Sequence, residues 1–268
     1  MKLVEKYSLR GKVAIITGGA GLLGIKHAEA VAEAGGIPIL WDINDKDAIE
    51  KASIIQKKFK TPAKGMKVDI TDLASVKKGL EQVLSFIRRE INEIDALIIE
   101  DYGKGVITPR LLAEIVPLAK KHKKIITVDP KVSHFPYYQG VTCITPNEKE
   151  AQGGSGIDIQ NDEDINRAGK KLLKDLNLEA ALITLGENGM RLFEKSGPIT
   201  HIPTVAQEVF DVSGAGDTVI AAFTLALASG ATKQEAAYIS NFAAGIVVSK
   251  VGTAVATKEE LLGRIDKK

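Results

Sequence analysis

Short apolar runs alternate with amphipathic stretches over most of the chain. The apolar runs predict buried strands at residues 12–17, 37–41, 65–68, 95–99, 125–128, 142–144 and 180–184. The amphipathic stretches predict helices at 21–34, 47–59, 72–89, 162–176, 214–229 and 233–248, with two more that begin at Pro109 and Lys258. Strands that alternate with helices are joined by crossover connections, so the pattern predicts βαβ units and a mostly parallel sheet.

The fold class expected from this pattern is α/β and doubly wound. A mostly parallel sheet should carry helices on both faces, as in a Rossmann-like three-layer sandwich. A small β-hairpin is expected in the C-terminal part, from 191–195 and 199–203 around Ser196-Gly197. The first three strands are expected in the order 3-2-1, with the fourth strand beside the first in one continuous sheet.

A glycine-rich turn joins the first strand to the first helix. It reads T-G-G-A-G-L-L-G over residues 17–24, with glycines at 18, 21 and 24. Glycines at this spacing allow a tight turn, close approach of a pyrophosphate and close packing of helix on strand. Asp42 ends the second strand, where an acid can accept hydrogen bonds from a ribose diol and disfavours a 2′-phosphate. The pattern therefore favours NAD over NADP.

A second nucleotide signal opens the helix at 214–229. The string D-V-S-G-A-G-D covers residues 211–217. Gly214, Ala215 and Gly216 are small residues at a helix N-terminus, where exposed backbone N–H groups can form an anion hole for a phosphoryl group. Asp217 lies in the first turn and could accept a proton from an attacking hydroxyl.

Composition narrows the class of protein. The 268 residues include 36 lysines and arginines against 34 acidic residues, so neither a nucleic acid nor a membrane surface is expected as the main partner. With 44% hydrophobic and 26% charged residues, the chain is not expected to be disordered. A single cysteine, Cys143, excludes an internal disulfide framework and a cysteine-rich zinc site. No apolar run approaches the roughly 18 residues of a membrane span, so a reducing, cytoplasmic compartment is expected.

Residues 8 to about 92 resemble the first half of a short-chain dehydrogenase/reductase. The resemblance rests on S-L-R-G-K-V-A-I-I-T-G-G-A-G at 8–21, on Asp42 and on V-D-I-T-D at 68–72. It implies that NAD contacts Gly18, Gly21, Leu22, Leu23, Gly24 and Asp42, and that Asp69 and Ile70 flank the adenine. The catalytic Tyr of that family is followed four positions later by Lys, and no tyrosine here has this partner. Hydride transfer is therefore disfavoured.

Residues from about 93 to 265 resemble the C-terminal part of ribokinase-like sugar kinases, with the heptose 7-phosphate kinases as the nearest match. The strings that carry the resemblance are D-Y-G-K-G-V at 101–106, V-D-P-K at 128–131, T-P-N-E-K-E at 145–150, T-L-G-E-N-G at 184–189 and G-A-G-D at 214–217.

This second resemblance implies a set of site residues. Asn147 and Glu150 would organise Mg²⁺ through water, and Asp217 would be the catalytic base. The ATP site would be lined by Thr184, Gly186, Gly189 and the G-A-G element, with Asn241 and its helix near the adenine. Lys104 and Lys131 would meet a sugar phosphate. The N-terminal half of that family, which supplies much of the sugar pocket and a β-rich lid, is not recognisable before residue 93.

The two resemblances together suggest one hybrid α/β domain over 1–268. A dehydrogenase-like segment, 1–92, would join a ribokinase-like segment, 93–268, in or near the strand at 95–99, within about 88–100. The expectation is an engineered chimeric scaffold that keeps both nucleotide-binding sites, for NAD and for ATP with Mg²⁺, without efficient catalysis. An ATP-dependent sugar kinase is the main alternative, and an NAD-dependent oxidoreductase is a weaker one. A homodimer is compatible with both resemblances.

Overall fold

A computed structural model describes residues 13–69, 72–103, 107–205, 209–252 and 254–265. The described residues form two compact units, and each is presented by itself. The first unit holds the described residues up to 97 together with 107–124. The second unit holds 98–103 and the described residues from 125 onward. No helix in these parts of the chain combines the length and the apolar character that a membrane crossing needs.

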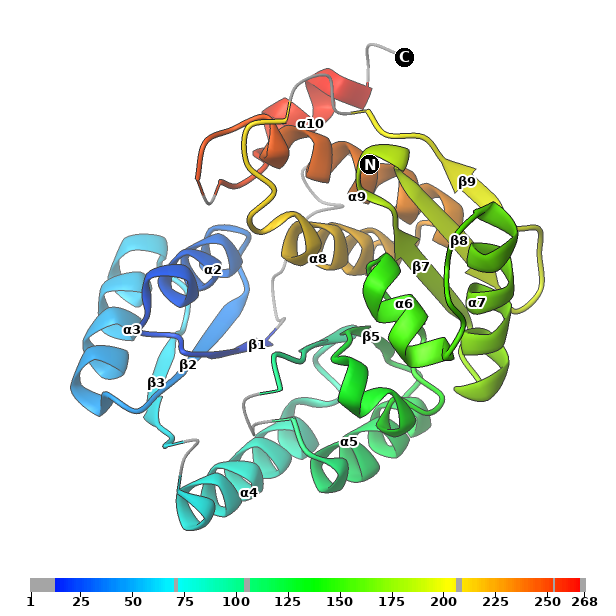
Figure 1. Cartoon of the computed structure of the whole chain (residues 1–268). Coiled ribbons are helices and arrows are strands. Elements are labelled where there is room, and N and C mark those ends of the chain that lie inside the picture. The colour runs from blue at the N-terminus through cyan, green and yellow to red at the C-terminus, as the bar shows by residue number, and fades with distance from the viewer. Residues whose placement is uncertain (1–12, 70–71, 104–106, 206–208, 253, 266–268) are drawn as a thin grey trace. The chain divides into compact units, whose positions relative to one another are not determined.

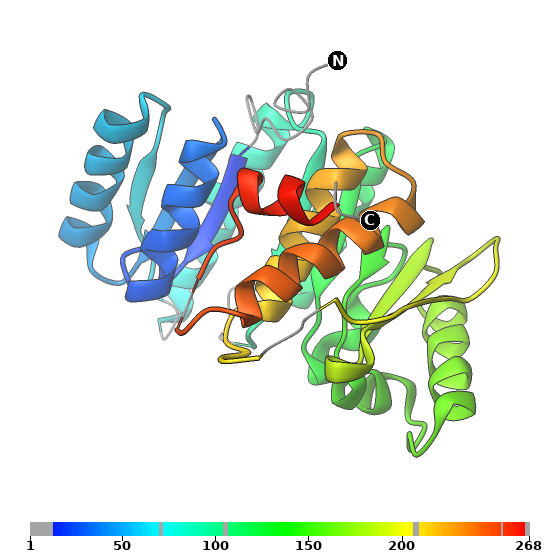
Figure 2. The ribbon, with the colours of Figure 1, turned by 90° about the horizontal axis from the view of Figure 1, so that it is seen from above.

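The first unit is built on a three-stranded parallel sheet (Figure 1). Its strands are β1 (Val13–Thr17), β2 (Ile37–Asp42) and β3 (Lys64–Lys67), and they pair in the order β1-β2-β3. Helices α2 (Leu22–Glu33) and α3 (Asp45–Phe59) cover one face of this sheet (Figure 2). A single cluster joins both helices to β2: Ala28, Ala32, Leu40, Ala52 and Ile55. Alanines at the contact let the helices approach the sheet closely.

Helices α4 (Leu73–Glu90) and α5 (Pro109–Lys121) also belong to the first unit and contact each other. Ion pairs link them: Arg88 to Glu114 and Arg110 to Glu81, each at 2.5 Å. The predicted start of α5 is confirmed, because the Thr108 side chain accepts a hydrogen bond from Leu111 N and Pro109 follows the cap.

The second unit contains six strands. They are β4 (Ala96–Glu100), β5 (Ile125–Asp129), β6 (Cys143–Ile144), β7 (Ala180–Thr184), β8 (Met190–Glu194) and β9 (Thr200–Ile202). They are ordered β4-β5-β6-β7-β8-β9, with parallel pairing from β5 to β7 and antiparallel pairing from β7 to β9. The predicted C-terminal hairpin is confirmed as β8 and β9.

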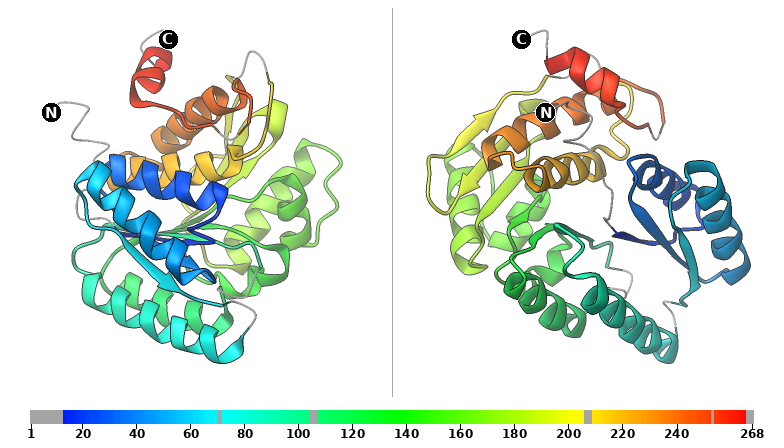
Figure 3. Two further views of the ribbon diagram at one scale, coloured as in Figure 1. Left: turned by 90° about the vertical axis from the view of Figure 1, so that its left-hand side faces the viewer. Right: turned by 180° about the vertical axis from the view of Figure 1, so that it is seen from behind.

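Helices cover both faces of this larger sheet (Figure 3). On one face lie α8 (Ala215–Ala228) and α9 (Lys233–Val248), which contact β5 and the β8–β9 hairpin. On the other lie α6 (Glu148–Ser155) and α7 (Asp162–Asp175), which contact β7. Helix α10 (Lys258–Ile265) contacts α9. The predicted α/β fold with helices on both faces is therefore confirmed.

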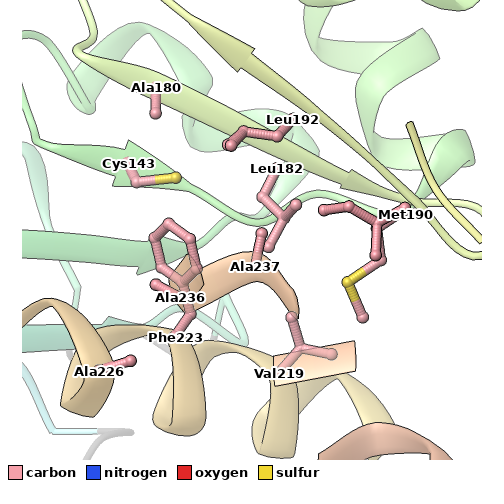
Figure 4. Close-up of a cluster of buried hydrophobic side chains, with 11 residues drawn as sticks. Cys143, Ala180, Leu182, Met190, Leu192, Val219, Phe223, Ala226, Ala236 and Ala237 are labelled. Atoms are coloured by element: carbon pink, nitrogen blue, oxygen red, sulfur yellow. The ribbon is translucent and has the colours of Figure 1, made fainter. Parts of the chain in front are cut away.

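The alternation of side chains along β7 and β8 determines which residues of these strands face the hydrophobic core. Leu182 and Leu192 point into a buried cluster that Phe223 of α8 and Ala237 of α9 complete (Figure 4). Successive residues of a strand face opposite sides, so Phe193 points the other way, against Gly169 of α7. A methyl group at Gly169 would lie 2.5 Å from the Phe193 ring, so the close packing of α7 requires a glycine here.

Strand pairing differs from the sequence prediction in one respect. The order 3-2-1 of the first three strands is confirmed, but the described strands form two sheets rather than one. Strand β4 pairs at the edge of the six-stranded sheet, next to β5, and is not hydrogen-bonded to β1. The prediction of one continuous sheet is therefore wrong for the described residues, because β4 completes the second sheet instead of extending the first.

Candidate active site

Three carboxylates meet within the second unit. Glu100 ends β4, Asp129 ends β5, and Asp217 lies in the first turn of α8. One carboxylate oxygen from each residue lies within 4.8 Å of the other two. Neighbouring strands bring Glu100 and Asp129 to one edge of the sheet, and helix α8 begins beside that edge.

Burial raises the pKa values of two of these carboxyl groups. The Glu100 Oε2 atom is buried and has no hydrogen-bond partner in the described structure. Burial, followed by the negative charges of Asp129 and Asp217, raises the pKa of Glu100 well above its usual range. Burial, and next the charge of Glu150, raises the pKa of Asp129 to about 7. The cluster therefore carries a proton near neutral pH or takes up a cation, and its hard oxygen ligands fit Mg²⁺.

Tyr102 contacts this cluster. Its hydroxyl donates a hydrogen bond to Asp217 Oδ1 at 2.9 Å. Burial and the adjacent Asp217 charge raise the pKa of Tyr102 above its usual value, so the phenol stays a neutral donor at physiological pH.

The residues on either side of Tyr102 are firmly held. Asp101 is buried, and its carboxylate accepts from the Tyr138 hydroxyl at 2.7 Å and from Gly103 N at 2.8 Å. His134 Nδ1 lies 2.7 Å from the same carboxylate. The Tyr138 hydroxyl in turn accepts from Lys131 N at 2.9 Å. The loop after β4 is thus fixed to the segment that follows β5.

Asn147 and Glu150, the predicted Mg²⁺ residues, form the capping box of helix α6. Asn147 Oδ1 accepts from Glu150 N at 3.0 Å, and Glu150 Oε2 accepts from Asn147 N at 2.9 Å. Burial raises the pKa of Glu150, whose charge also acts on Asp129. The N-x-x-E pattern therefore has a structural role, while it also places a carboxylate near the acidic cluster.

The predicted nucleotide loop follows β7. Thr184 pairs with Asn147 through an isolated parallel bridge, so these two predicted site residues lie side by side. Gly186 has a positive φ of 57° and open space where a side chain would stand. Gly189 differs, because a methyl group there would lie 2.1 Å from the Ile202 carbonyl oxygen. The structure therefore requires a glycine at 189 for close packing of the hairpin, independently of any ligand.

A cavity of about 330 Å³ adjoins the same loop. Leu185, Glu187 and Asn188 line it from the loop, and Arg191, His201 and Thr204 line it from the hairpin side. Arg191 pairs with Asp162 at 3.0 Å, also in the lining. The remaining carboxylates of the lining, Glu148 and Glu187, disfavour a phosphate inside this cavity.

The G-A-G-D element begins α8 as predicted. Gly214 is the N-cap with φ 78°, and no side chain caps the helix there. A methyl group on Gly214 or on Gly216 would meet no atom within 4 Å, so the turn faces open space. Ala215 N donates a hydrogen bond to the Val212 carbonyl. The unshielded start of α8 suits an anion that approaches from outside.

Asn241, predicted with its helix to lie near the adenine, is hydrogen-bonded within the protein. It is buried in α9, and its Nδ2 donates to the Pro203 carbonyl at 2.8 Å. The amide therefore holds the chain that leaves β9. Any approach to an adenine would come from the surrounding helix and the chain after β9 rather than from this amide N–H.

The glycine-rich turn of the first unit has well-defined geometry. Asp42 Oδ2 accepts from Ala20 N at 3.0 Å, and its Oδ1 accepts from Asn44 N at 3.1 Å. A methyl group at Gly24 would lie 2.2 Å from the Gly18 carbonyl oxygen, so the third glycine is required for packing. Two predicted cofactor residues are exposed here: Leu22 and Leu23.

The remaining residues predicted for this turn follow β3. Val68 N donates to the Asp42 carbonyl at 2.9 Å, which places Asp69 in the segment beside Asp42. Two residues with predicted roles, Ile70 and Lys104, lie outside the described residues.

Three residues of this site, Asp101, Tyr102 and Asp129, lie in the sequence motifs but had no predicted role. Three others, Glu100, His134 and Tyr138, were not among the predicted site residues. Acidic residues stand at the end of two consecutive apolar runs, E-D after 96–99 and D after 125–128. Since strand ends of neighbouring strands lie together, this signal could have located the cluster. No local pattern predicts the contact between Tyr102 and Asp217, because 115 positions separate them.

Comparison with known proteins identifies two family patterns in the chain. The pattern of the pfkB family of carbohydrate kinases matches residues 70–260, and that of short chain dehydrogenases matches residues 12–103.

Proteins named bifunctional protein HldE are similar in sequence to this chain. The one from Geobacter sulfurreducens is 44% identical over 184 residues, which cover 69% of this chain and 38% of that protein. The one from Citrifermentans bemidjiense is 40% identical over 201 residues, 75% of this chain and 41% of that protein. The chain thus spans about two fifths of the length of these relatives.

Solved structures extend the similarity of fold to most of the chain. Ribokinase from Giardia lamblia matches with a TM-score of 0.71 and 18% identity, covering 97% of this chain and 99% of that one. Phosphofructokinase-2 from Escherichia coli, solved in complex with potassium, matches with a TM-score of 0.72 and 16% identity, covering 90% of this chain and 85% of that one.

These matches correct the main functional expectation. An engineered chimera without efficient catalysis is not supported, because the carbohydrate kinase pattern extends from residue 70 across the expected junction. A ribokinase fold also matches nearly the whole chain, the dehydrogenase-like segment included. Both families are built from right-handed βαβ units, so a segment with dehydrogenase-like sequence can form part of a ribokinase-like fold. The resemblance to ribokinase-like kinases is confirmed, and the chain belongs to the pfkB family of carbohydrate kinases.

Proposed function

We propose that the protein is an ATP-dependent sugar kinase that transfers the γ-phosphoryl group of ATP to a hydroxyl of a heptose 7-phosphate. The observation that carries the proposal is the position of Asp217 in the first turn of α8, directly after the uncapped G-A-G turn. A base and an anion-binding turn on one helix end bring the acceptor hydroxyl and the phosphoryl group together.

The phosphates of ATP would bind at the start of α8. The backbone N–H groups of Gly214 and Gly216 and the helix dipole favour the negative charge that builds up on the transferred group. The N–H of Ala215 between them is hydrogen-bonded to the Val212 carbonyl. Thr184 and Gly186 would border the nucleotide from the loop after β7, and Gly189 shapes that loop. This part of the proposal rests on the open space at Gly186, Gly214 and Gly216.

Mg²⁺ would be held near Asn147 and Glu150, through water, and near the carboxylates of Glu100 and Asp129. The buried Glu100 Oε2 without a partner supports a cation here. When bound, Mg²⁺ neutralises charge on the phosphate oxygens. The carboxylates fix the place of the ion, and Glu150 is fixed in turn by the capping box.

In the chemical step, Asp217 accepts the proton of the acceptor hydroxyl. The hydroxyl oxygen forms a bond to the γ-phosphorus, and the bond between this phosphorus and the bridging oxygen of ADP breaks. ADP leaves with the electron pair of that bond, and the proton held by Asp217 passes to solvent. The phosphate already on the sugar would meet Lys131, an exposed cation whose stem lies over Gly103.

The test is product analysis with a panel of sugars. Purified protein is incubated with Mg-ATP and heptose 7-phosphate, ribose or fructose 6-phosphate, and products are identified by ³¹P NMR and mass spectrometry. A bisphosphate formed from the heptose phosphate supports the proposal. Phosphorylation of ribose alone would contradict the substrate class, and ATP hydrolysis without any sugar product would contradict the transferase activity.

We also propose that the glycine-rich turn of the first unit binds the adenosine part of NAD. Asp42 supports this, because Ala20 N of the glycine-rich turn donates to its Oδ2 and Asn44 N donates to its Oδ1. Calorimetric titration with NAD tests it, with Asp42→Ala as the variant and Asp45→Ala as a matched surface control. Equal affinity in the two variants, or no heat in the wild type, would contradict this binding site.

We further propose a reducing, cytoplasmic compartment and a homodimer. Cys143 is a free, buried thiol, which agrees with a reducing compartment. One solved relative is described as a tetrameric inhibited form of phosphofructokinase-2. Light scattering of the purified protein decides the oligomeric state.

A further inference from the structure

Tyr102 is a part of the D-Y-G-K-G segment that the proposed reaction leaves without a task. Its side chain is 54% exposed, so burial in the core does not explain it. Its hydroxyl nevertheless donates to Asp217 Oδ1 at 2.9 Å, across 115 positions of sequence and within one compact unit. We propose that Tyr102 is a positioning residue that fixes the rotation of the Asp217 carboxylate for proton abstraction, an inference that rests on the proposed kinase function.

The backbone around Tyr102 is fixed before any ligand binds. Asp101 is buried and held by the Tyr138 hydroxyl, by Gly103 N and by the ring of His134. Gly103 has a positive φ of 65°, and the stem of Lys131 lies against it. A donor anchored on both sides can hold its partner without a large loss of entropy when the reaction occurs.

The neighbours of Asp217 make such a donor useful. Glu100 from β4 and Asp129 from β5 each place a carboxylate oxygen within 4.8 Å of an Asp217 oxygen. The hydrogen bond from Tyr102 to Oδ1 fixes how the Asp217 carboxylate is rotated among these neighbours. A hydrogen bond from a neutral donor to an ionised carboxylate is stronger than one between two neutral groups.

The experiment compares Tyr102→Phe with Tyr137→Phe. Tyr137 is a matched control, because it is 40% exposed and its ring lies 5.7 Å from that of His134, a contact that phenylalanine retains. Tyr102→Phe should lower kcat by about 10- to 100-fold, the effect of losing a hydrogen bond to a charged group. The KM for Mg-ATP should stay within about twofold, because the hydroxyl contacts the base and not the nucleotide turn. Tyr137→Phe should match the wild type.

A double-mutant cycle separates positioning from a general effect on structure. In an Asp217→Asn background, Tyr102→Phe should change the residual rate by no more than about twofold. A loss as large as in the wild-type background would overturn the inference, and so would a Tyr102→Phe enzyme with the kcat of Tyr137→Phe. A rise in KM at unchanged kcat would also overturn it. If the wild type itself forms no sugar product, the proposed function fails, and this inference fails with it.

Discussion

At the scale of single residues, the site depends on four side chains that converge at the start of α8. Asp217 is placed by the helix, Glu100 and Asp129 by the ends of β4 and β5, and Tyr102 by the anchored loop after β4. Burial raises the pKa of Glu100 and of Asp129. The phenol of Tyr102, beside the Asp217 carboxylate, remains a hydrogen-bond donor.

Replacing the proposed base tests its role directly. Asp217→Asn should lower kcat by about 100- to 10,000-fold, the usual contribution of a general base. The Kd for Mg-ATP, measured by calorimetry, should change little, because the backbone N–H groups of the turn remain. A variant that keeps more than a tenth of the wild-type kcat would exclude Asp217 as the base.

The burial of Asp129 also predicts how the stability of the protein depends on pH. The folded-state pKa of Asp129 is about 7, against 3.8 for the exposed group, so the folded protein binds the extra proton between these values. This stabilisation is complete below about pH 4 and is lost as the pH rises through 7. Asp129→Asn removes the charge and should raise the free energy of unfolding at pH 8 by a few kcal/mol. Each unit by which folding raises the pKa of Asp129 corresponds to about 1.4 kcal/mol.

The measurement for Asp129 is urea denaturation from pH 4 to pH 8. The wild type should lose stability over this range more steeply than Asp129→Asn. Added Mg²⁺ should stabilise the wild type at pH 8 more than the variant. Parallel pH profiles for the two proteins would contradict the assignment.

At the scale of elements, two glycines that look alike in the sequence have opposite roles. Gly189 is enclosed by the hairpin, where an added methyl group would lie 2.1 Å from the Ile202 carbonyl oxygen. Gly216 is in the first turn of α8, and a methyl group there would meet nothing within 4 Å. One glycine is required by packing, and the other leaves room for a ligand.

The substitutions Gly189→Ala and Gly216→Ala should therefore separate stability from function. Gly189→Ala should destabilise the protein by about 2 to 4 kcal/mol, through the clash and the positive φ of 79°. Gly216→Ala should raise stability by about 0.5 to 1 kcal/mol, as expected for alanine in a helix. It should nevertheless weaken Mg-ATP binding, because the methyl group occupies the phosphate approach.

Thermal unfolding and calorimetry measure both effects. Loss of stability in Gly216→Ala, or unchanged affinity for Mg-ATP, would show that the start of α8 is not the phosphate site. An unchanged melting temperature in Gly189→Ala would contradict the packing argument.

At the scale of the whole molecule, each sequence segment carries a glycine-containing turn that we propose as a phosphate-binding site. We propose one cooperative domain over 1–268, so NAD and Mg-ATP should each raise the melting temperature of the same transition. For either ligand at about 100 times its Kd, the stabilisation should be about 2.7 kcal/mol. Scanning calorimetry tests this, and two separate transitions, each shifted by one ligand, would contradict a single cooperative domain.

Much of this architecture was predictable from local patterns. Alternation of apolar runs and amphipathic stretches predicted the strands, and T-G-G-A-G-L-L-G and G-A-G-D predicted where helices begin. Strand pairing between β4 and β5 was not predictable, because it depends on how distant segments meet. The contact of Tyr102 with Asp217 was missed for the same reason. The capping role of Asn147 is local, and the N-x-x-E pattern at 147–150 could have predicted it. The dehydrogenase-like start suggested a chimera because βαβ units in different families share one pattern.

The central claim is that Asp217 and the turn before it transfer phosphate to a sugar phosphate. The most direct measurement is ADP release from Mg-ATP with and without heptose 7-phosphate, by wild type and Asp217→Asn at equal concentration. We predict ADP release that depends on the sugar phosphate and falls by at least about 100-fold in the variant. Equal ADP release by both proteins, or none from a folded wild type that binds Mg-ATP, would contradict the account.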